Sequence, residues 1–379
     1  MYNKVIYIVK TDLHYYPPCM AQIRMLKKTG VNIEVWFASS NQSAVDILEK
    51  EDIKYACLGE SPRIATKAGK VKNWVEFRKK VSNQIAKYDQ VELDSTLFWT
   101  GTAESAIPLL GVIDKHNYIL TMLELLDDSS NKGKLKLFGK LAKKAKSVVV
   151  CEETRAYLVR YWFGLNRLPY IMPNKPYGLR AIRRTEPTCE QTRKAIEQIQ
   201  DKKFIIYQGI FQNVDYMTEL AKALKEINSV YYLVIMGFDL YKTNMYQKIH
   251  SIYDKVIQLD SLPAPLHLEV TSYADIGLVF YEGDTLNRAY CAPNKIYEYS
   301  AFGIPSLGNK IPGLENTIGK ARAGICGEFK KDKLAEAIKD ITKNYTMYED
   351  NSLKFYEETD NQAIIDEIIR DNHITTERE

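Results

Sequence analysis

The amino-acid sequence predicts an α/β protein that is built from two domains of similar construction. With 379 residues the chain is longer than one hydrophobic core usually supports. Short apolar runs alternate with amphipathic stretches through both halves of the chain, and this alternation is typical of parallel sheets covered by helices. A polar, aperiodic stretch near the middle separates the two series and is expected to be a hinge.

In the first half, runs of strand length alternate with helical segments. The strands are predicted at Val5–Val9, Ile33–Ala38, Gln90–Leu93, Tyr118–Leu123 and Ser147–Cys151. The helices are predicted at Cys19–Thr29, Trp74–Ala86, Glu104–Ile113 and Thr154–Tyr161. We therefore expect an N-terminal domain over residues 1–172, followed by a hinge over 173–201 that holds one helix, Cys189–Ile199.

The second half repeats this alternation. Its strands are predicted at Phe204–Tyr207, Tyr231–Ile235, Val256–Leu259, Ile276–Phe280 and Ile304–Leu307. Its helices are predicted at Tyr216–Ile227, Lys295–Ala301, Lys333–Asn344 and Asn361–Arg370. The second domain is thus expected over residues 202–350, and residues 351–379 should hold a helix that packs back toward the N-terminal domain and a flexible tail.

Composition and charge narrow the classes of protein. The six cysteines stand singly, as reduced thiols in a cytosolic protein do, and no histidine cluster has metal-ligand spacing. We found no leader peptide and no apolar run of the roughly 20 residues that cross a bilayer, so a cytoplasmic protein is expected. The first 176 residues carry a net charge of +9 and the rest −5, which indicates that the first domain faces an anionic ligand or surface. No recognised module supports nucleic acid as that partner.

The most informative segment is P-N-K-I-Y-E-Y-S-A-F-G-I-P, residues 293–305, which follows a strand-like run. Asn294 is predicted to cap a helix whose free N–H groups favour an anion. Lys295 adds a positive charge in the first turn, where it opposes the helix dipole but suits a diphosphate. Glu298, one turn further on, could accept hydrogen bonds from both hydroxyls of a ribose. An ordinary strand–cap–helix unit is the alternative interpretation.

This segment resembles the donor-site signature of GT-B glycosyltransferases of family 4 (group 1), in a version seen in bacterial surface-polysaccharide biosynthesis. The resemblance implies two Rossmann-like domains that face each other across a cleft, with ligands at the carboxyl ends of the strands. It assigns Glu298 to the nucleotide ribose, and it assigns donor contacts to Tyr290, Cys291, Ala292 and Asn294. The chain departs from the family pattern at Tyr290, where relatives carry a first glutamate.

Weaker similarities to the same family occur at the ends of other strands of the second half. Gly209 in I-I-Y-Q-G-I-F matches the glycine at which backbone approaches the diphosphate, although the usual Arg and Lys do not follow it. Gly237 ends the next strand, L-V-I-M-G. The backbone up to Leu262 is implied to hold the base.

Two segments of the first half resemble the family pattern more loosely. Asp12 and His14 lie in the loop after the first strand, where either could act as a base on an acceptor hydroxyl or be a surface residue. The segment Tyr118–Asp128 resembles a D-S-H-E-L segment of relatives, so Glu124 matches its glutamate, whereas Leu123 stands in place of the histidine.

Lys132–Lys146 holds seven lysines and no acid, with apolar residues between them. As a helix this segment would be basic and amphipathic, which suits an anionic membrane surface. A solvated helix of the first domain is the alternative.

These observations predict a glycosyltransferase, with a retaining hexosyl transfer favoured, that moves a sugar from a UDP-sugar to a polysaccharide-repeat or lipid-linked acceptor. Lys295 would stabilise the leaving diphosphate. No cofactor and no metal are expected, since the family works without metal and no Asp-x-Asp occurs. Two alternatives stay open: a nucleotide-sugar 2-epimerase of similar fold, and a non-catalytic nucleotide-sugar-binding partner in a synthesis complex.

Overall fold

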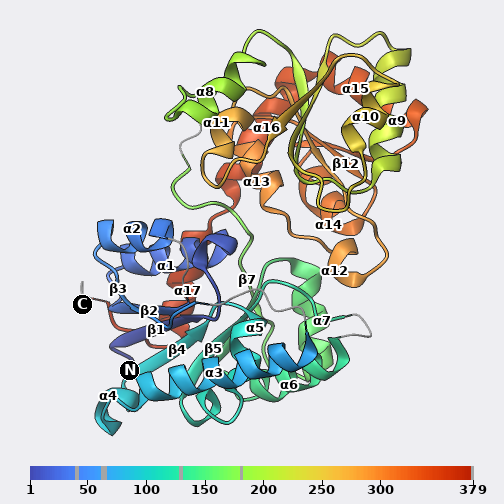
Figure 1. Ribbon diagram of the computed structural model, residues 1–379. Helices are drawn as coiled ribbons and strands as arrows, with labels where there is room; N and C mark the ends of the chain where they lie inside the picture. The colour runs from blue at the N-terminus through green and yellow to red at the C-terminus, as the bar shows by residue number, and fades with distance from the viewer. Residues whose placement is uncertain (39–41, 61–65, 128–130, 180–181, 377–379) are drawn as a thin grey trace. The chain divides into compact units, whose positions relative to one another are not determined.

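The computed structural model describes residues 1–38, 42–60, 66–127, 131–179 and 182–376, which form two compact units (Figure 1). Unit 1 comprises Met1–Tyr177 together with Asp360–Glu379, and unit 2 comprises Gly178–Thr359. Each unit contains one parallel sheet with helices on both faces. The two-domain α/β fold predicted from the alternation of strands and helices is confirmed.

Unit 1 has a seven-stranded parallel sheet in the order β3-β2-β1-β4-β5-β6-β7. Its strands are β1 (Lys4–Val9), β2 (Ile33–Phe37), β3 (Lys54–Cys57), β4 (Thr96–Thr100), β5 (Asn117–Met122), β6 (Ser147–Val150) and β7 (Tyr170–Ile171). Its helices are α1 (Pro17–Lys28), α2 (Gln42–Lys50), α3 (Lys67–Ile85), α4 (Gln90–Asp94), α5 (Ala103–Ala106), α6 (Lys132–Ala142), α7 (Glu153–Phe163) and α17 (Asn361–Asp371).

The strands of unit 1 are apolar almost throughout because helices cover both faces of the sheet. Helices α3, α6 and α7 pack on one face, and α1, α2 and α17 pack on the other (Figure 1). In β1, all residues from Val5 to Val9 are fully buried. The carboxyl ends of all strands therefore lie along one edge of a rigid sheet, and the loops that follow them share that edge.

Unit 2 has a six-stranded parallel sheet in the order β10-β9-β8-β11-β12-β13. Its strands are β8 (Phe204–Ile210), β9 (Tyr232–Phe238), β10 (Val256–Asp260), β11 (Ile276–Val279), β12 (Ser306–Asn309) and β13 (Gly324–Gly327). Its helices are α8 (Glu190–Glu197), α9 (Val214–Glu226), α10 (Met245–His250), α11 (His267–Thr271), α12 (Leu286–Ala289), α13 (Asn294–Ala301), α14 (Pro312–Leu314), α15 (Lys331–Lys343) and α16 (Tyr345–Glu358). Helices α9, α10 and α15 cover one face, and α8, α11 and α13 cover the other (Figure 1).

Two elements that were predicted in unit 1 have a different structure. The expected strand Gln90–Leu93 is the helix α4, because Asp89 and Glu92 close a capping box at its start. The strand that precedes β5 is instead Thr96–Thr100, every residue of which is buried. The expected helix Glu104–Ile113 is broken after Ala106, where Pro108 lies in a 3-10 turn and cannot continue an α-helix.

Two predicted domain boundaries also differ from those of the units. Part of the expected hinge, residues 173–201, forms α8, whose Ile196 lies with Ile199 in the core of unit 2. At the other end, α16 continues unit 2 beyond residue 350. The last residues of the expected tail, 377–379, lie outside the described residues.

Helix α17 belongs to unit 1 although it follows unit 2 in the sequence. Its residues Ile365 and Ile368 are fully buried beside α1 and the sheet. The backbone beyond the helix pairs with the start of the chain: Tyr2 donates to the carbonyl of His373 at 2.8 Å, and Thr375 donates to the carbonyl of Tyr2 at 2.7 Å. Unit 1 is thus completed by residues from both ends of the sequence described here.

Candidate functional site

The candidate site lies at the carboxyl edge of the unit 2 sheet, where the order of the strands reverses. Strand β8 pairs with β9 on one side and with β11 on the other, so the connections from β8 and β11 diverge at this point. In open parallel sheets this divergence leaves a crevice outside the strand ends, and ligands bind there. The residues predicted to bind the donor lie at the carboxyl ends of β8 and β9 or follow β10 and β11.

At two glycines of this edge the backbone carries no side chain. Gly209 in β8 and Gly237 in β9 are paired directly across the sheet, and both have positive φ, +124° and +153°. A Cβ atom on Gly237 would lie 1.8 Å from the carbonyl oxygen of Gly209, so no side chain fits there. Both positions therefore require glycine, and the backbone at Gly209 is open to close approach by a ligand.

Lys295 reaches this bare backbone from α13. Its Nζ lies 3.3 Å from the position that a Cβ of Gly209 would take, and 5.3 Å from the ring centroid of Tyr207. Burial lowers the pKa of Lys295 to about 8, although the negative charge of Glu298 acts in the opposite direction. No carboxylate among the described residues forms an ion pair with Lys295. Its positive charge is therefore available to an anionic ligand.

The start of α13 differs in one detail from the prediction. Asn294 is the first helical residue and does not cap the helix; Pro293 occupies the cap position and makes no side-chain cap hydrogen bond. The predicted cap role of Asn294 is wrong because the extended conformation ends one residue earlier, at Pro293 (ψ 138°). The residue at the cap position thus offers no side-chain acceptor to the first N–H groups of α13.

Glu298 is buried on the same helix, one turn beyond Lys295, with 8% of its surface exposed. Its Oε2 accepts a hydrogen bond from Gln208 Nε2 at 2.8 Å, and its Oε1 lies 3.5 Å from His267 Nε2. Sequence reasoning missed both partners. The signal for Gln208 was available, because a glutamine in an otherwise apolar buried strand needs a hydrogen-bond partner.

The segment before α13 contains three more of the predicted donor-binding residues. Tyr290 and Ala292 are partly buried, and Cys291 is buried in a small apolar cluster with Ile296. A Cβ on Gly313 would lie 2.5 Å from the backbone nitrogen of Cys291, so α14 lies directly against this segment. Close packing holds the backbone here in one position.

Leu262, the residue predicted beside the base, follows β10. It is partly buried against the cluster that contains Leu259 and Tyr273. Asp260, the last residue of β10, is paired with Gly237 of β9. The backbone of Leu262, two residues further on, therefore lies at the same edge of the sheet as Gly237.

In unit 1 the predicted residues also lie at the carboxyl edge of the sheet. Asp12 follows β1 and is 3% exposed, whereas Glu124 follows β5 and is exposed. The rings of His14 and Tyr15 lie against each other, with centroids 3.9 Å apart and a tilt of 41° between their planes. Burial raises the pKa of Tyr16, and the charge of Glu124 adds to that shift, so Glu124 lies near the loop after β1. Asp128, the last residue of the segment matched around Glu124, lies outside the described residues.

The basic segment Lys132–Lys146 does contain a helix, α6, but the apolar side of this helix is not free. Phe138, Leu141 and Ala142 are buried in the core of unit 1. The prediction of an amphipathic surface helix is therefore wrong in its apolar half, because that half packs against the sheet. What remains on the surface is a row of exposed lysines, which includes Lys136 and Lys140.

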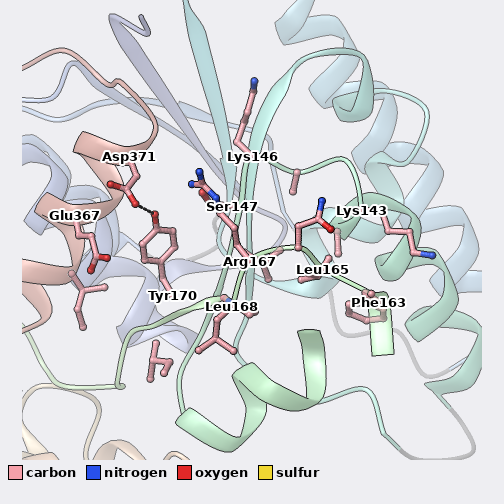
Figure 2. A pocket seen from close by; sticks show the side chains of 18 residues that line it. Lys143, Lys146, Ser147, Phe163, Leu165, Arg167, Leu168, Tyr170, Glu367 and Asp371 are labelled. Atoms are coloured by element: carbon pink, nitrogen blue, oxygen red, sulfur yellow. Dashed lines mark hydrogen bonds between the residues drawn. The ribbon is translucent and has the colours of Figure 1, made fainter. Parts of the chain in front are cut away.

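A cavity of about 880 Å³ opens at the opposite edge of the unit 1 sheet, where β6 and β7 begin (Figure 2). Tyr170 donates a hydrogen bond to Asp371 at 2.7 Å on one side of it, and Lys143 and Lys146 extend in different directions (Figure 2). None of the predicted site residues lines this cavity. It therefore has no part in the candidate site.

Within the described part of the chain, no group of three or more His, Cys, Asp or Glu side chains could hold a metal ion. Over the same residues, no helix has the length and apolar character that a membrane span requires.

Comparison with known proteins gives one distant sequence relative and many structural ones. No protein-family model matches the chain. A UDP-N-acetylglucosamine--N-acetylmuramyl-(pentapeptide) pyrophosphoryl-undecaprenol N-acetylglucosamine transferase of Aquifex aeolicus is 26% identical over 277 residues, which cover 67% of this chain and 70% of that protein.

Several solved structures match nearly the whole chain, and two of them are described here. Anabaena Alr3699/HepE in complex with UDP and glucose has a TM-score of 0.68 and 14% identity, over 99% of this chain and all of the other. UDP-GlcNAc 2-epimerase from Neisseria meningitidis bound to UDP-GlcNAc has a TM-score of 0.66 and 13% identity, over 98% of this chain and all of the other. These likenesses show the fold of the two units.

Proposed function

We propose that this chain, a GT-B-type protein with a distant transferase homologue, is a glycosyltransferase that transfers a sugar from a UDP-sugar to a saccharide or lipid-linked acceptor. One observation carries the proposal. The ammonium of Lys295, which has no ion-pair partner among the described residues, lies over the backbone of Gly209, and the buried carboxylate of Glu298 follows one helical turn later. A cation and a carboxylate at this spacing suit the diphosphate and the ribose of one nucleotide.

Unit 2 would hold the donor. Lys295 and the first N–H groups of α13 would take the diphosphate, Glu298 the ribose, and the backbone at Leu262 the base. The segment from Tyr290 to Ala292 would lie along the sugar. The relatives support UDP as the nucleotide, since the Aquifex protein is a UDP-N-acetylglucosamine transferase and the Anabaena structure holds UDP.

In the reaction, the bond between the sugar C1 and the diphosphate oxygen breaks, and the acceptor oxygen forms a new bond to C1. The leaving UDP gains negative charge, which Lys295 would stabilise through its ammonium. The acceptor proton would pass to a base on unit 1, where Asp12, His14 and Glu124 are the candidates. We propose that no metal and no cofactor take part, because Lys295 supplies the charge that a metal would supply.

The motif at residues 293–305 supports a place in family 4, whose members retain the configuration at C1. Tyr290 stands where that family has a glutamate. Product stereochemistry, determined by NMR on the isolated glycoside, tests this assignment. An inverted product would contradict it.

The experiment that tests the proposed function has two steps. First, the thermal unfolding midpoint is measured with UDP-, GDP-, dTDP- and CMP-sugars, and a UDP-sugar should raise it by several degrees. Second, the UDP-sugar is incubated with extracted lipid acceptor, with and without EDTA, and transfer is followed by release of UDP. Absence of any shift would contradict the proposal.

The same experiment separates the second candidate, a 2-epimerase, which the similarity to the Neisseria enzyme favours. An epimerase would convert the UDP-sugar to its epimer in the absence of acceptor. A non-catalytic binding protein would show the thermal shift but neither transfer nor epimer.

We also propose that unit 1 associates with an anionic membrane surface through the lysines of α6. The support is electrostatic: Lys132, Lys136 and Lys140 are exposed, whereas the apolar side of the helix is buried. On the neighbouring helix α7, Tyr157 and Tyr161 are 54% and 84% exposed, and aromatic side chains of this kind favour membrane interfaces.

Replacement of Lys132, Lys136 and Lys140 by serine is expected to weaken vesicle binding about 100-fold, because each lysine near such a surface contributes about 1 kcal/mol. Co-sedimentation with phosphatidylcholine vesicles that contain phosphatidylserine measures the effect. Binding of the unmodified protein should also fall at high salt.

The matched control replaces three exposed lysines of unit 2, Lys320, Lys339 and Lys343, by serine. This variant has the same net charge as the first and should sediment like the unmodified protein. Equal loss in both variants would show that net charge and not α6 is responsible.

A further inference from the structure

The carboxylate of Glu298 is held by a short chain of buried side chains. Gln208 Nε2 donates to Glu298 Oε2 at 2.8 Å, and the Oε1 of the same amide accepts from Thr271 Oγ1 at 2.8 Å. Gln208 is 5% exposed and Thr271 is fully buried. The three residues come from β8, α11 and α13, so the chain joins three separate elements of unit 2.

The orientation of the Gln208 amide follows from its neighbours. An ionised carboxylate only accepts hydrogen bonds, so the NH2 group must face Glu298 and the oxygen must face Thr271. The reverse orientation would place two acceptors against each other. Thr271 is held in turn by helix α11, where its hydroxyl also lies 2.9 Å from the carbonyl oxygen of His267.

The hydrogen-bonding capacity of Glu298 is only partly used in this arrangement. A carboxylate can accept about four hydrogen bonds, two at each oxygen. Gln208 takes one position at Oε2, and His267 Nε2 lies 3.5 Å from Oε1. Among the described residues, at least one acceptor position is thus left at each oxygen, and a pair of adjacent hydroxyl groups requires one at each.

We propose that Gln208 and Thr271 are positioning residues that fix the Glu298 carboxylate for both hydroxyls of a ribose, so that the site selects ribonucleotides over 2′-deoxyribonucleotides. This inference rests on the proposed function, in which Glu298 binds the nucleotide sugar through its ribose. A carboxylate held in one orientation cannot turn to compensate for a missing hydroxyl. The 2′-deoxy ligand therefore leaves an acceptor of a nearly buried charge unpaired, and such a loss is costly.

The test compares the affinity of the full chain for UDP and for 2′-deoxy-UDP by isothermal titration calorimetry. These two ligands differ in one hydroxyl. The unmodified protein is expected to prefer UDP by about 10- to 100-fold, the value of one hydrogen bond to a charged group. In Gln208→Met, which keeps the length of the side chain, UDP should bind about 10-fold more weakly and the preference should fall below about 5-fold.

Thr271 provides a graded pair of variants. Thr271→Val has nearly the same shape without the hydroxyl and should lower the preference for UDP, whereas Thr271→Ser keeps the hydroxyl and should retain it. Unfolding midpoints of all variants without ligand show that the comparison is made on folded protein. If Gln208→Met does not fold, the Thr271 pair decides the outcome.

The results separate this inference from the proposed function. Equal binding of UDP and 2′-deoxy-UDP by the unmodified protein overturns the inference and leaves the proposed function standing. A preference that persists unchanged in Gln208→Met and Thr271→Val overturns it as well. Failure of the unmodified protein to bind either ligand overturns the proposed function and the inference with it.

Discussion

Replacement of Lys295 by methionine is expected to lower kcat/KM for a UDP-sugar by about 100- to 1000-fold, the usual effect of removing one group that stabilises a developing charge. Methionine keeps most of the length of the side chain and removes only the charge. The expected effect is large because the residues that follow the Gly209 turn, Gln212 to Asp215, include neither the arginine nor the lysine that family 4 enzymes usually carry there. The measurement is the initial rate of UDP release against donor concentration.

The control for this variant is Lys343→Met, which removes an exposed lysine of α15. It should leave kcat/KM within about 2-fold of the unmodified value, since exposed charges contribute little. Retention of full activity in Lys295→Met would contradict the role of Lys295 and would point to another source of positive charge.

The ionisation of Lys295 gives this prediction a pH dependence. Because its pKa is lowered to about 8, the side chain is a cation below this pH and neutral above it. Affinity for UDP-glucose, whose diphosphate keeps the same charge in this range, should therefore fall as the pH rises from 7 to 9. Lys295→Arg should show no such fall, because a guanidinium stays charged throughout.

Replacement of Glu298 by alanine is expected to weaken UDP binding by about 100-fold or more, since it removes two charge-assisted hydrogen bonds of about 1.5–3 kcal/mol each. It also leaves the buried Gln208 amide without its acceptor, so the unfolding midpoint should fall in the absence of ligand. The thermal shift that UDP produces in the unmodified protein should disappear.

Glu336→Ala is the matched control for Glu298→Ala. Glu336 is exposed on α15 and pairs with Lys333 at the surface, so its loss should change neither the unfolding midpoint nor the UDP shift noticeably. A UDP shift in Glu298→Ala as large as in the unmodified protein would remove the ribose assignment.

The features that could be predicted from the sequence are local ones. Buried parallel strands are continuous apolar runs, and this pattern is visible without a structure. The segment with Lys295 and Glu298 was also recognisable. Both residues lie on one short helix, and their spacing of three residues predicts that their side chains are one turn apart. The exception is the cap at Pro293, where a shift of one residue changed the role of Asn294.

The features that could not be predicted depend on contacts between distant segments. Gln208 and Glu298 are 90 residues apart in the sequence, and no local pattern pairs them. The burial of the apolar side of α6 follows from the neighbouring sheet and not from the helix itself. A basic amphipathic helix has the same sequence pattern whether its apolar side packs against protein or against lipid.

The placement of α17 has a consequence for how the protein is made. Unit 2 is continuous in sequence, so all its elements are present once the ribosome has passed Thr359, whereas unit 1 still lacks α17 at that point. Until Ile365 and Ile368 emerge, the apolar side of α1 that they cover stays open to solvent or to chaperones. Unit 1 is therefore translated first but completed last. A nascent chain that stalls before α17 has emerged exposes the same apolar side of α1.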